Sequence, residues 1–186
     1  MEIHAGDEND PEKPSKTEIL FVSAPLKSYD NPGTFDDTDL SDIKIGNEKF
    51  FPIVDKFCYL GTMLTRDCRD DEDVCCRIKK AGNAFGSLRR SLFANPYIDY
   101  DAKGAVYRTL ILSILLYGAE TWCLTEKLYN QLRLFHHTCV RAMHRVNRRH
   151  VFLHHISNME LLDNVNVKSI EFYVTKCQLS WLGHVA

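Results

Sequence analysis

One apolar stripe constrains the fold of this chain more than any other feature. From Val74 to Leu92, apolar residues recur at alternating spacings of four and three, which puts them on one face of an α-helix. The stripe consists of Val74, Ile78, Ala81, Phe85, Leu88 and Leu92. Asp70 and Asp71 can cap the start of this helix, and Asn95-Pro96 can end it. The pattern predicts a long amphipathic helix that packs one side against a core.

Helical patterns continue to the end of the chain. A second helix is predicted from about Tyr100 to Tyr117, with Asp99 as its cap and Gly118 closing it. Because this segment is apolar on nearly all sides after Leu110, we expect it to be the buried central helix.

Three further helical elements are predicted. Thr125 can cap a third helix, a shorter element begins near Asn158, and a last one ends at Gly183. The third has the apolar stripe Leu128, Leu132, Phe135, Cys139, Ala142 or Met143, and Val146, and the last carries Val167, Ile170, Val174, Cys177 and Trp181. We expect Trp122 and Trp181 to anchor the core.

Strand patterns precede these helices. Thr17–Val22 is a short apolar run, and the punctuated stretch Pro25–Leu40 predicts a loop. Two runs with strand character, Asp42–Lys49 and Val54–Leu64, lie around the turn signal Gly46-Asn47 and predict a hairpin. The fold is therefore expected to be mainly α, with a small β-hairpin before a helical domain.

Composition excludes several classes of protein. A chain of 186 residues with 45% hydrophobic and 26% charged residues can bury a core, so wholesale disorder is excluded. The longest apolar run, Leu110–Tyr117, is much shorter than the roughly 20 residues that a membrane-spanning helix needs, so no membrane partner is expected. No secretory signal is visible, and seven cysteines without framework spacing favour a reducing, intracellular compartment, nucleus or cytoplasm.

Charge is unevenly distributed along the chain. Residues 1–60 contain 6 Lys and Arg against 13 Asp and Glu, whereas residues 61–186 contain 17 against 12. The formal charges are therefore −7 and +5, which agree with the net charge of −2. Such polarisation indicates a polyanionic partner for the second part.

The strongest basic pattern lies on the third predicted helix. Arg133, His137, Arg141 and Arg145 recur every four residues and share one face, and Arg148 and Arg149 follow. Several cations along one face give salt-sensitive, sequence-independent binding of nucleic acid. The competing interpretation is an ordinary solvated helix surface. That interpretation is favoured for a second basic set: Lys79, Lys80, Arg89 and Arg90.

Six strings in a fixed order carry a resemblance. They are PSKTEIL at 14–20, KFCYLGTML at 56–64, RIKKAGNAFGSL at 77–88, LLYGAETWCL at 115–124, FHHTCVRAM at 135–143 and LSWLGHV at 179–185. Together they resemble the C-terminal third of the endonuclease–reverse transcriptase of non-LTR (LINE-type) retrotransposons. LLYGAETW and the final WLGHV are the most specific parts.

The resemblance implies a role for each segment. Residues 1–13 would be a disordered acidic tail, 14–65 a palm-end strand and primer-grip hairpin, 66–150 a helical thumb-like domain, and 151–186 a truncated helical extension. Lys16 looks like the motif D lysine, near the phosphates of the incoming nucleotide. Phe57, Tyr59, Leu60 and Gly61 look like the primer grip, although by pattern alone Tyr59 is a strand aromatic that faces a core.

The same resemblance implies that this chain is not an enzyme on its own. The family's Mg²⁺-binding aspartates precede motif D, and no counterpart of them is found here. Phe35-Asp36-Asp37 follows motif D and lacks the aromatic-x-Asp-Asp spacing. We therefore expect no cofactor, and as partners an RNA–DNA or DNA duplex and the parent polyprotein's palm and fingers.

Other sites have weaker support. Cys139, His144, His150 and His154 match a zinc finger only loosely, and a buried free cysteine is the commoner role for Cys139. Asp67, Asp70, Asp71 and Asp73 suit a helix N-terminus better than a metal site. The alternative function is a structural remnant of a transposable element that packs on other protein and binds no nucleic acid.

Overall fold

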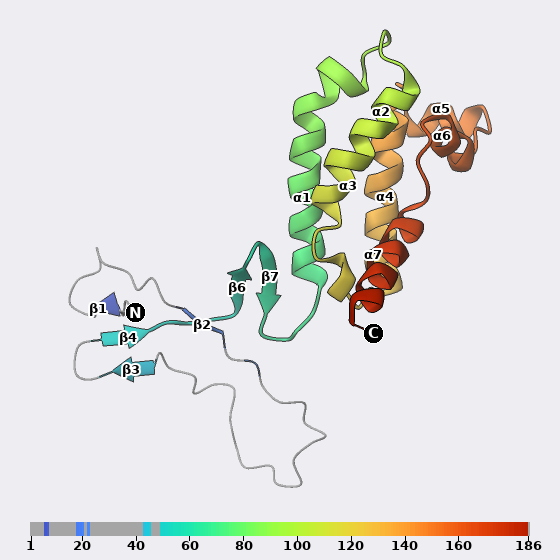
Figure 1. Ribbon diagram of the computed structural model, residues 1–186. Helices are drawn as coiled ribbons and strands as arrows, with labels where there is room; N and C mark the ends of the chain where they lie inside the picture. Colours follow the sequence, from blue (N-terminus) through green and yellow to red (C-terminus); the bar gives the residue numbers. More distant parts are fainter. Residues whose placement is uncertain (1–5, 8–17, 21, 23–42, 46–48, 186) are drawn as a thin grey trace. The chain divides into compact units, whose positions relative to one another are not determined.

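The computed structural model describes residues 6–7, 18–20, 22, 43–45 and 49–185 (Figure 1). It divides into two compact units, residues 1–69 and 70–186. The described chain is mainly helical, with short strands confined to the first unit.

The first unit contains short paired strands. Strand β4 (Lys49–Phe51) pairs antiparallel with both β1 (Gly6–Asp7) and β3 (Ile43–Ile45), and β2 (Ile19–Leu20) pairs parallel with β5 (Ile53–Val54). The predicted hairpin is confirmed only in part, because β3 pairs with β4 and not with the predicted second run, Val54–Leu64. The turn 46–48 and the predicted loop 25–40 lie outside the described residues. Within the predicted tail, Gly6–Asp7 form a strand.

The predicted strand over Val54–Leu64 is wrong as a single element. Strands β6 (Lys56–Tyr59) and β7 (Thr62–Thr65) form an antiparallel hairpin in which Tyr59 lies opposite Thr62. The chain reverses at Leu60-Gly61, where φ is 47° and 88°. Positive φ at both central residues matches the twist of a tight hairpin, and Gly61 adopts it without strain.

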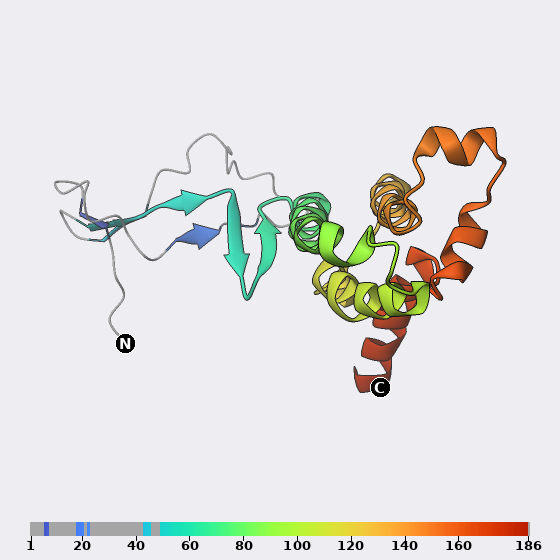
Figure 2. The same cartoon turned by 90° about the horizontal axis from the view of Figure 1, so that it is seen from above.

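The second unit is a helical bundle with two short helices at one end (Figure 2). Four segments form the bundle: α1 (Asp71–Leu88), the chain from α2 (Tyr100–Val106) to α3 (Leu112–Leu115), α4 (Glu126–Met143) and α7 (Ile170–Val185). The short helices are α5 (Arg148–Leu153) and α6 (Asn158–Asn164), and η4 (Ala119–Thr121) is a 3₁₀ turn. Helix α7, predicted as part of a separate extension, packs against α4 and η4.

The core confirms the apolar stripe of the first helix. Val74, Ala81 and Phe85 are buried, and the other members of the stripe are half-buried against them. Phe85 stacks on Phe93 at a centroid distance of 4.3 Å, and the Tyr107 ring meets both of them edge-on. Phe93 and Tyr107 lie in π-helical turns, η2 (Arg89–Phe93) and η3 (Tyr107–Ile111).

Helix caps agree with the sequence except at the first helix. The Asp99 side chain accepts a hydrogen bond from the Asp101 backbone, and Thr125 accepts one from Leu128, as predicted. The Asp70 side chain caps nothing in its own helix. Its carboxylate instead accepts from the backbone N–H of Cys123 at 2.7 Å, which ties the start of α1 to the segment before α4.

Two further predictions hold only in part. In the central helix, Ile111, Leu112 and Leu115 are buried, but Leu110 and Tyr117 are exposed. Trp122 is buried and donates from Nε1 to Asp73 at 2.9 Å, whereas Trp181 is 51% exposed and does not anchor the core. Among the described residues, no helix is long and apolar enough to cross a membrane.

Candidate nucleic-acid interface

Helix α4 carries the predicted basic face, and its first member is already neutralised. The Arg133 guanidinium forms ion pairs with Glu126 and with Glu171 of α7, and it also donates to Asn130 at 2.9 Å. These carboxylates raise its pKa further above the ordinary range of arginine. A phosphate contact at Arg133 would have to compete with two ion pairs, so this residue serves the α4–α7 packing.

The two adjacent histidines of α4 are not cations at neutral pH. His136 is completely buried, and burial lowers its pKa to about 4. His137 is half-buried, and burial followed by the positive charge of Arg141 lowers its pKa as well. His137, predicted as part of the charged face, therefore offers a hydrogen bond rather than a charge.

The remaining arginines lie together where α4 gives way to α5. Arg141 is half-buried on α4, Arg145 is exposed just after the helix, and Arg148 and Arg149 are exposed in the first turn of α5. We call these four residues the basic end. Burial, followed by the positive charge of Arg148, lowers the pKa of Arg141. An anion bound between these two arginines would relieve their mutual repulsion.

A tight turn fixes the position of Arg145. The Arg145 N–H donates to the carbonyl of Ala142 and the Val146 N–H to that of Arg141, and Arg145 has a φ of 58°. This is the Schellman pattern, in which the left-handed position is usually glycine. Asn147 then caps α5 by accepting from the His150 N–H at 2.7 Å.

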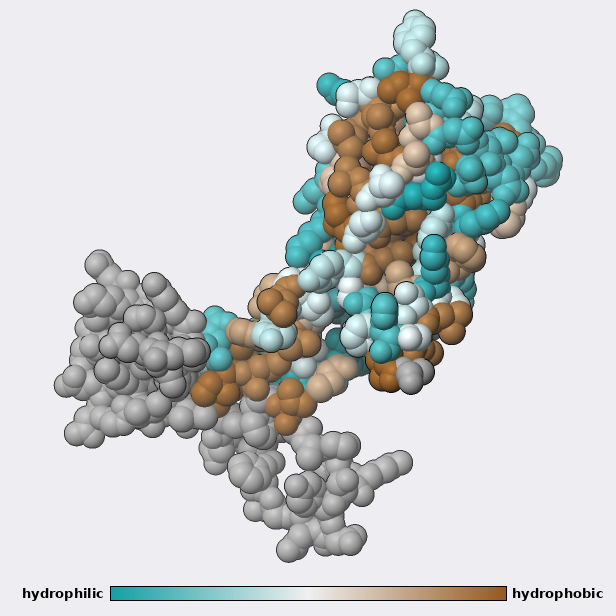
Figure 3. All heavy atoms as spheres, viewed as in Figure 1, coloured by the Kyte–Doolittle hydropathy of each residue, from teal (hydrophilic) through white to brown (hydrophobic). Residues whose placement is uncertain are grey.

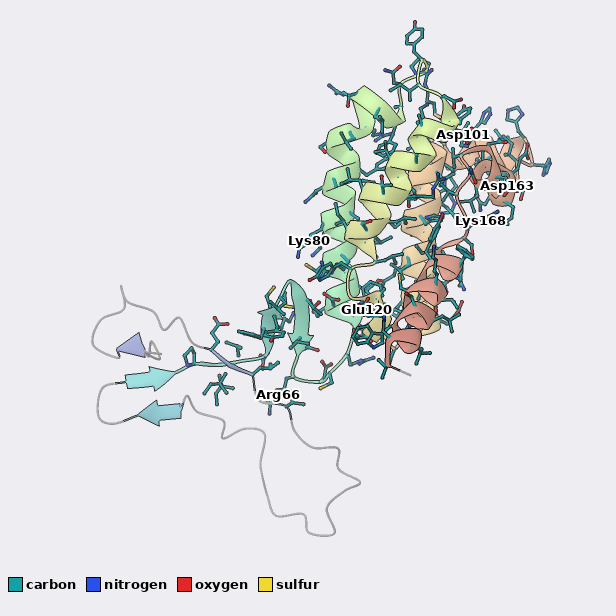
Figure 4. The ribbon with its side chains drawn as sticks, viewed as in Figure 1. Arg66, Lys80, Asp101, Glu120, Asp163 and Lys168 are labelled. Carbon is teal, nitrogen blue, oxygen red and sulfur yellow. The ribbon has the colours of Figure 1, made fainter. Side chains whose placement is uncertain are left out.

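The basic end has no acidic residues near it in sequence. From Lys127 to Met159 the chain contains six Lys and Arg, six His, and no Asp or Glu. Figure 3 shows hydrophilic residues over the end of the unit that carries α5 and α6. The acidic residues labelled in Figure 4 on this unit's α2 and α6, Asp101 and Asp163, lie outside this stretch of sequence. Among the described residues, Arg145, Arg148 and Arg149 form no ion pair.

A groove of about 490 Å³ lies between α4 and α5. Arg141 and Arg148 line it together with His137, His155 and Asn158, and with the apolar side chains of Leu134, Val151, Phe152 and Ile156. None of these residues is acidic, so the groove combines positive charge with apolar surface.

One buried lysine beside the basic end could not be found from the sequence pattern. Lys103 on α2 is 2% exposed, and its Nζ lies 3.5 Å from the Met143 carbonyl oxygen and 5.0 Å from the ring centroid of Tyr100. Burial and then the charge of Arg145 lower the pKa of Lys103. Lysine is an ordinary exposed helix residue, so its pattern in the sequence could not reveal this place.

The second basic set lies elsewhere. Lys79 and Lys80 are exposed on α1, and Arg89 and Arg90 are exposed in η2. Helix α4 lies between α1 and α5 in Figures 1 and 2. Lys80 is labelled in Figure 4.

The residues that resemble a primer grip form the β6–β7 hairpin. Tyr59 is 58% exposed and Leu60 is 75% exposed, whereas Phe57 and Gly61 are half-buried. Tyr59 therefore does not face a core. The prediction from its strand pattern alone, that it would face one, is wrong. Lys16 and Phe35-Asp36-Asp37 lie outside the described residues.

The loose zinc pattern is not brought together. Cys139 is buried, which raises the pKa of its thiol to about 12. His144 is bonded through Nε2 to the Leu161 carbonyl and stacks on Tyr100. His150 on α5 and His154 directly after it have ring centroids 4.2 Å apart. In the described part of the chain, no three His, Cys, Asp or Glu side chains are placed to hold a metal ion.

Comparisons with protein families, with curated proteins and with solved structures found no match.

Proposed function

We propose that residues 70–186 bind nucleic acid through the basic end. The observation that carries the proposal is that Arg145, Arg148 and Arg149 are exposed and form no ion pair within the described residues. Exposed arginines without carboxylate partners leave their charge available to phosphate, and each neutralised phosphate releases condensed counterions.

The resemblance to non-LTR reverse transcriptases supports the choice of ligand. In that family the segment corresponding to residues 66–150, which contain the basic end, would be the thumb, which bears on the template–primer duplex. We therefore propose an RNA–DNA duplex as the first ligand to test. The proposed activity is binding without catalysis, because none of the residues in the basic end is a nucleophile or a general base.

The proposal is tested by comparing the two basic sets. Fluorescence anisotropy would measure binding of a labelled RNA–DNA duplex to the chain, to Arg148→Gln with Arg149→Gln, and to the matched control Lys79→Gln with Lys80→Gln. Loss of two phosphate contacts should weaken binding about tenfold or more for the first pair. The control pair should bind as the unmodified chain does. Equal losses in both pairs would overturn the assignment to the basic end.

A second candidate function rests on helix α7. Five of its apolar side chains are exposed: Phe172, Leu179, Trp181, Leu182 and Val185. Large apolar side chains exposed along one helix are typical of a protein–protein contact. If the chain is a structural remnant that packs on other protein, size-exclusion chromatography will show self-association that persists in high salt, and the duplex will not bind.

A further inference from the structure

The groove between α4 and α5 contains an aromatic ring that the core does not use. The Phe152 side chain is 76% exposed, and Leu134 across the groove is 59% exposed. No residue of α5 is fully buried. Phe152 therefore contributes little to folding by burial, although exposing an aromatic ring to water is unfavourable.

Hydrogen bonds at both ends hold Phe152 in place instead. Asn147 caps the start of α5, and the His155 N–H donates to the Phe152 carbonyl at 3.3 Å at its end. The Ile156 N–H donates to the Val151 carbonyl at 3.1 Å, and His155 has a φ of 52°. This second Schellman turn repeats the turn at Arg145, so the backbone of a six-residue helix is fixed on both sides.

The neighbours of the ring suit a nucleotide. Arg141 and Arg148 line the same groove and carry charge for phosphate. His137, half-buried beside them, has imidazole nitrogens that can bond the edge of a base. Proteins that bind single strands combine such a positive groove with aromatic side chains on which bases stack. A base pair inside a duplex offers no free face to the ring, because its neighbours stack on both of its faces.

We propose that the α4–α5 groove binds an unpaired base of a single-stranded nucleic acid, with the base stacked on Phe152 and the flanking phosphates on Arg141 and Arg148. This inference rests on the proposed function, and it names the form of nucleic acid that this site prefers. It extends that function from charge alone to recognition of strands with accessible bases.

The test compares a labelled DNA strand of about 20 nucleotides with a blunt DNA duplex of about 10 base pairs, which carries nearly the same number of phosphates, at one salt concentration. Replacing Phe152→Leu keeps an apolar side chain and removes the stacking face, so single-strand affinity should fall about tenfold while duplex affinity stays unchanged. Phe152→Trp should retain the single-strand affinity, which shows that the aromatic face is what matters. Phe172→Leu on α7, another exposed phenylalanine, is the matched control and should change neither affinity.

The outcomes separate this inference from the proposed function. Unchanged single-strand binding by Phe152→Leu, or an equal loss for both ligands, overturns the stacking site while duplex binding by the basic end stands. Failure of the unmodified chain to bind either ligand overturns the proposed function and the inference together. If polyglutamate displaces the labelled single strand as well as an unlabelled single strand does, the groove recognises charge alone. This result too overturns the inference.

Discussion

The hydroxyl of Tyr107 and Nδ1 of His136 lie 2.9 Å apart, and both side chains are completely buried. Nε2 of the same histidine lies 3.0 Å from the backbone carbonyl of Lys168, which can only accept. Nε2 therefore carries the proton, Nδ1 accepts, and the Tyr107 hydroxyl donates. This chain of hydrogen bonds joins η3, α4 and the segment before α7 inside the core.

Removing the Tyr107 hydroxyl, which donates to His136, should destabilise the protein. Tyr107→Phe keeps the ring that packs against Phe85 and Phe93 but leaves Nδ1 of His136 buried without its partner. We expect a loss of about 1–3 kcal/mol in the free energy of unfolding, measured by urea denaturation. Tyr97→Phe is the matched control, because Tyr97 is 95% exposed, and it should change nothing. Equal stabilities of the two variants would contradict the buried hydrogen bond between Tyr107 and His136.

Stability should depend on pH through the same histidine. The unfolded state protonates His136 near pH 6.5, whereas the folded state protonates it only near pH 4. The unfolded state thus binds more protons between these values, so the stabilising contribution is complete above about pH 6.5 and is lost as pH falls toward 4. The total loss from this group is about 3 kcal/mol.

Urea denaturation between pH 7.5 and pH 4.5 measures this dependence. Burial lowers the pKa of His137 and His144 too, so these residues steepen the slope in the same direction. His136→Gln should make the slope shallower by about one proton. A stability that is flat or rises as the pH falls through this range would show that His136 is not buried in its neutral form.

Two glycines should respond in opposite ways to the same substitution. A Cβ on Gly104 of α2 would overlap the backbone carbonyl of Val165, whereas a Cβ on Gly86 of α1 would meet nothing within 4 Å. Gly104→Ala should therefore cost about 1–3 kcal/mol through steric strain. Gly86→Ala should stabilise by about 0.5–1 kcal/mol, because alanine loses less backbone entropy in a helix. Thermal unfolding of both variants tests the close approach of Gly104 to the Val165 backbone. A Gly104→Ala variant as stable as the unmodified protein would refute it.

Replacing Arg145 by glycine separates binding from folding. Arg145 has a left-handed backbone that disfavours any residue with a Cβ, so Arg145→Gly should leave stability unchanged or raise it by about 1 kcal/mol. The same change removes one cation of the basic end and should weaken duplex binding. Weaker binding by an equally stable variant cannot be attributed to unfolding. Unchanged affinity would exclude Arg145 from the interface.

The helical patterns could be predicted because burial follows a simple period. Val74, Ala81 and Phe85 fall on one face of α1, and the caps Asp99 and Thr125 precede their helices as expected. Helix α5 was missed because its turns use Arg145 and His155 at positions where glycine is the usual signal. With six residues and nothing fully buried, it also has no apolar stripe to detect.

The candidate site could be predicted only in part. Spacing placed Arg133 and Arg141 on one face of α4, but it could not show that Glu126 and Glu171 neutralise Arg133, because Glu171 lies 38 residues away. Burial of His137 depends on tertiary packing for the same reason. The groove at Phe152 forms between two helices and leaves no pattern in either one.

The salt dependence of binding tests the central claim most directly. The association constant of the chain for a labelled RNA–DNA primer–template would be measured by anisotropy across a range of salt concentrations, alongside the Arg141→Ala, Arg145→Ala variant. Binding through the basic end predicts a steep negative slope of log K against log salt, flattened by about one to two units in the variant. A folded chain that binds nothing at low salt, or a variant whose slope equals that of the unmodified chain, would contradict the claim.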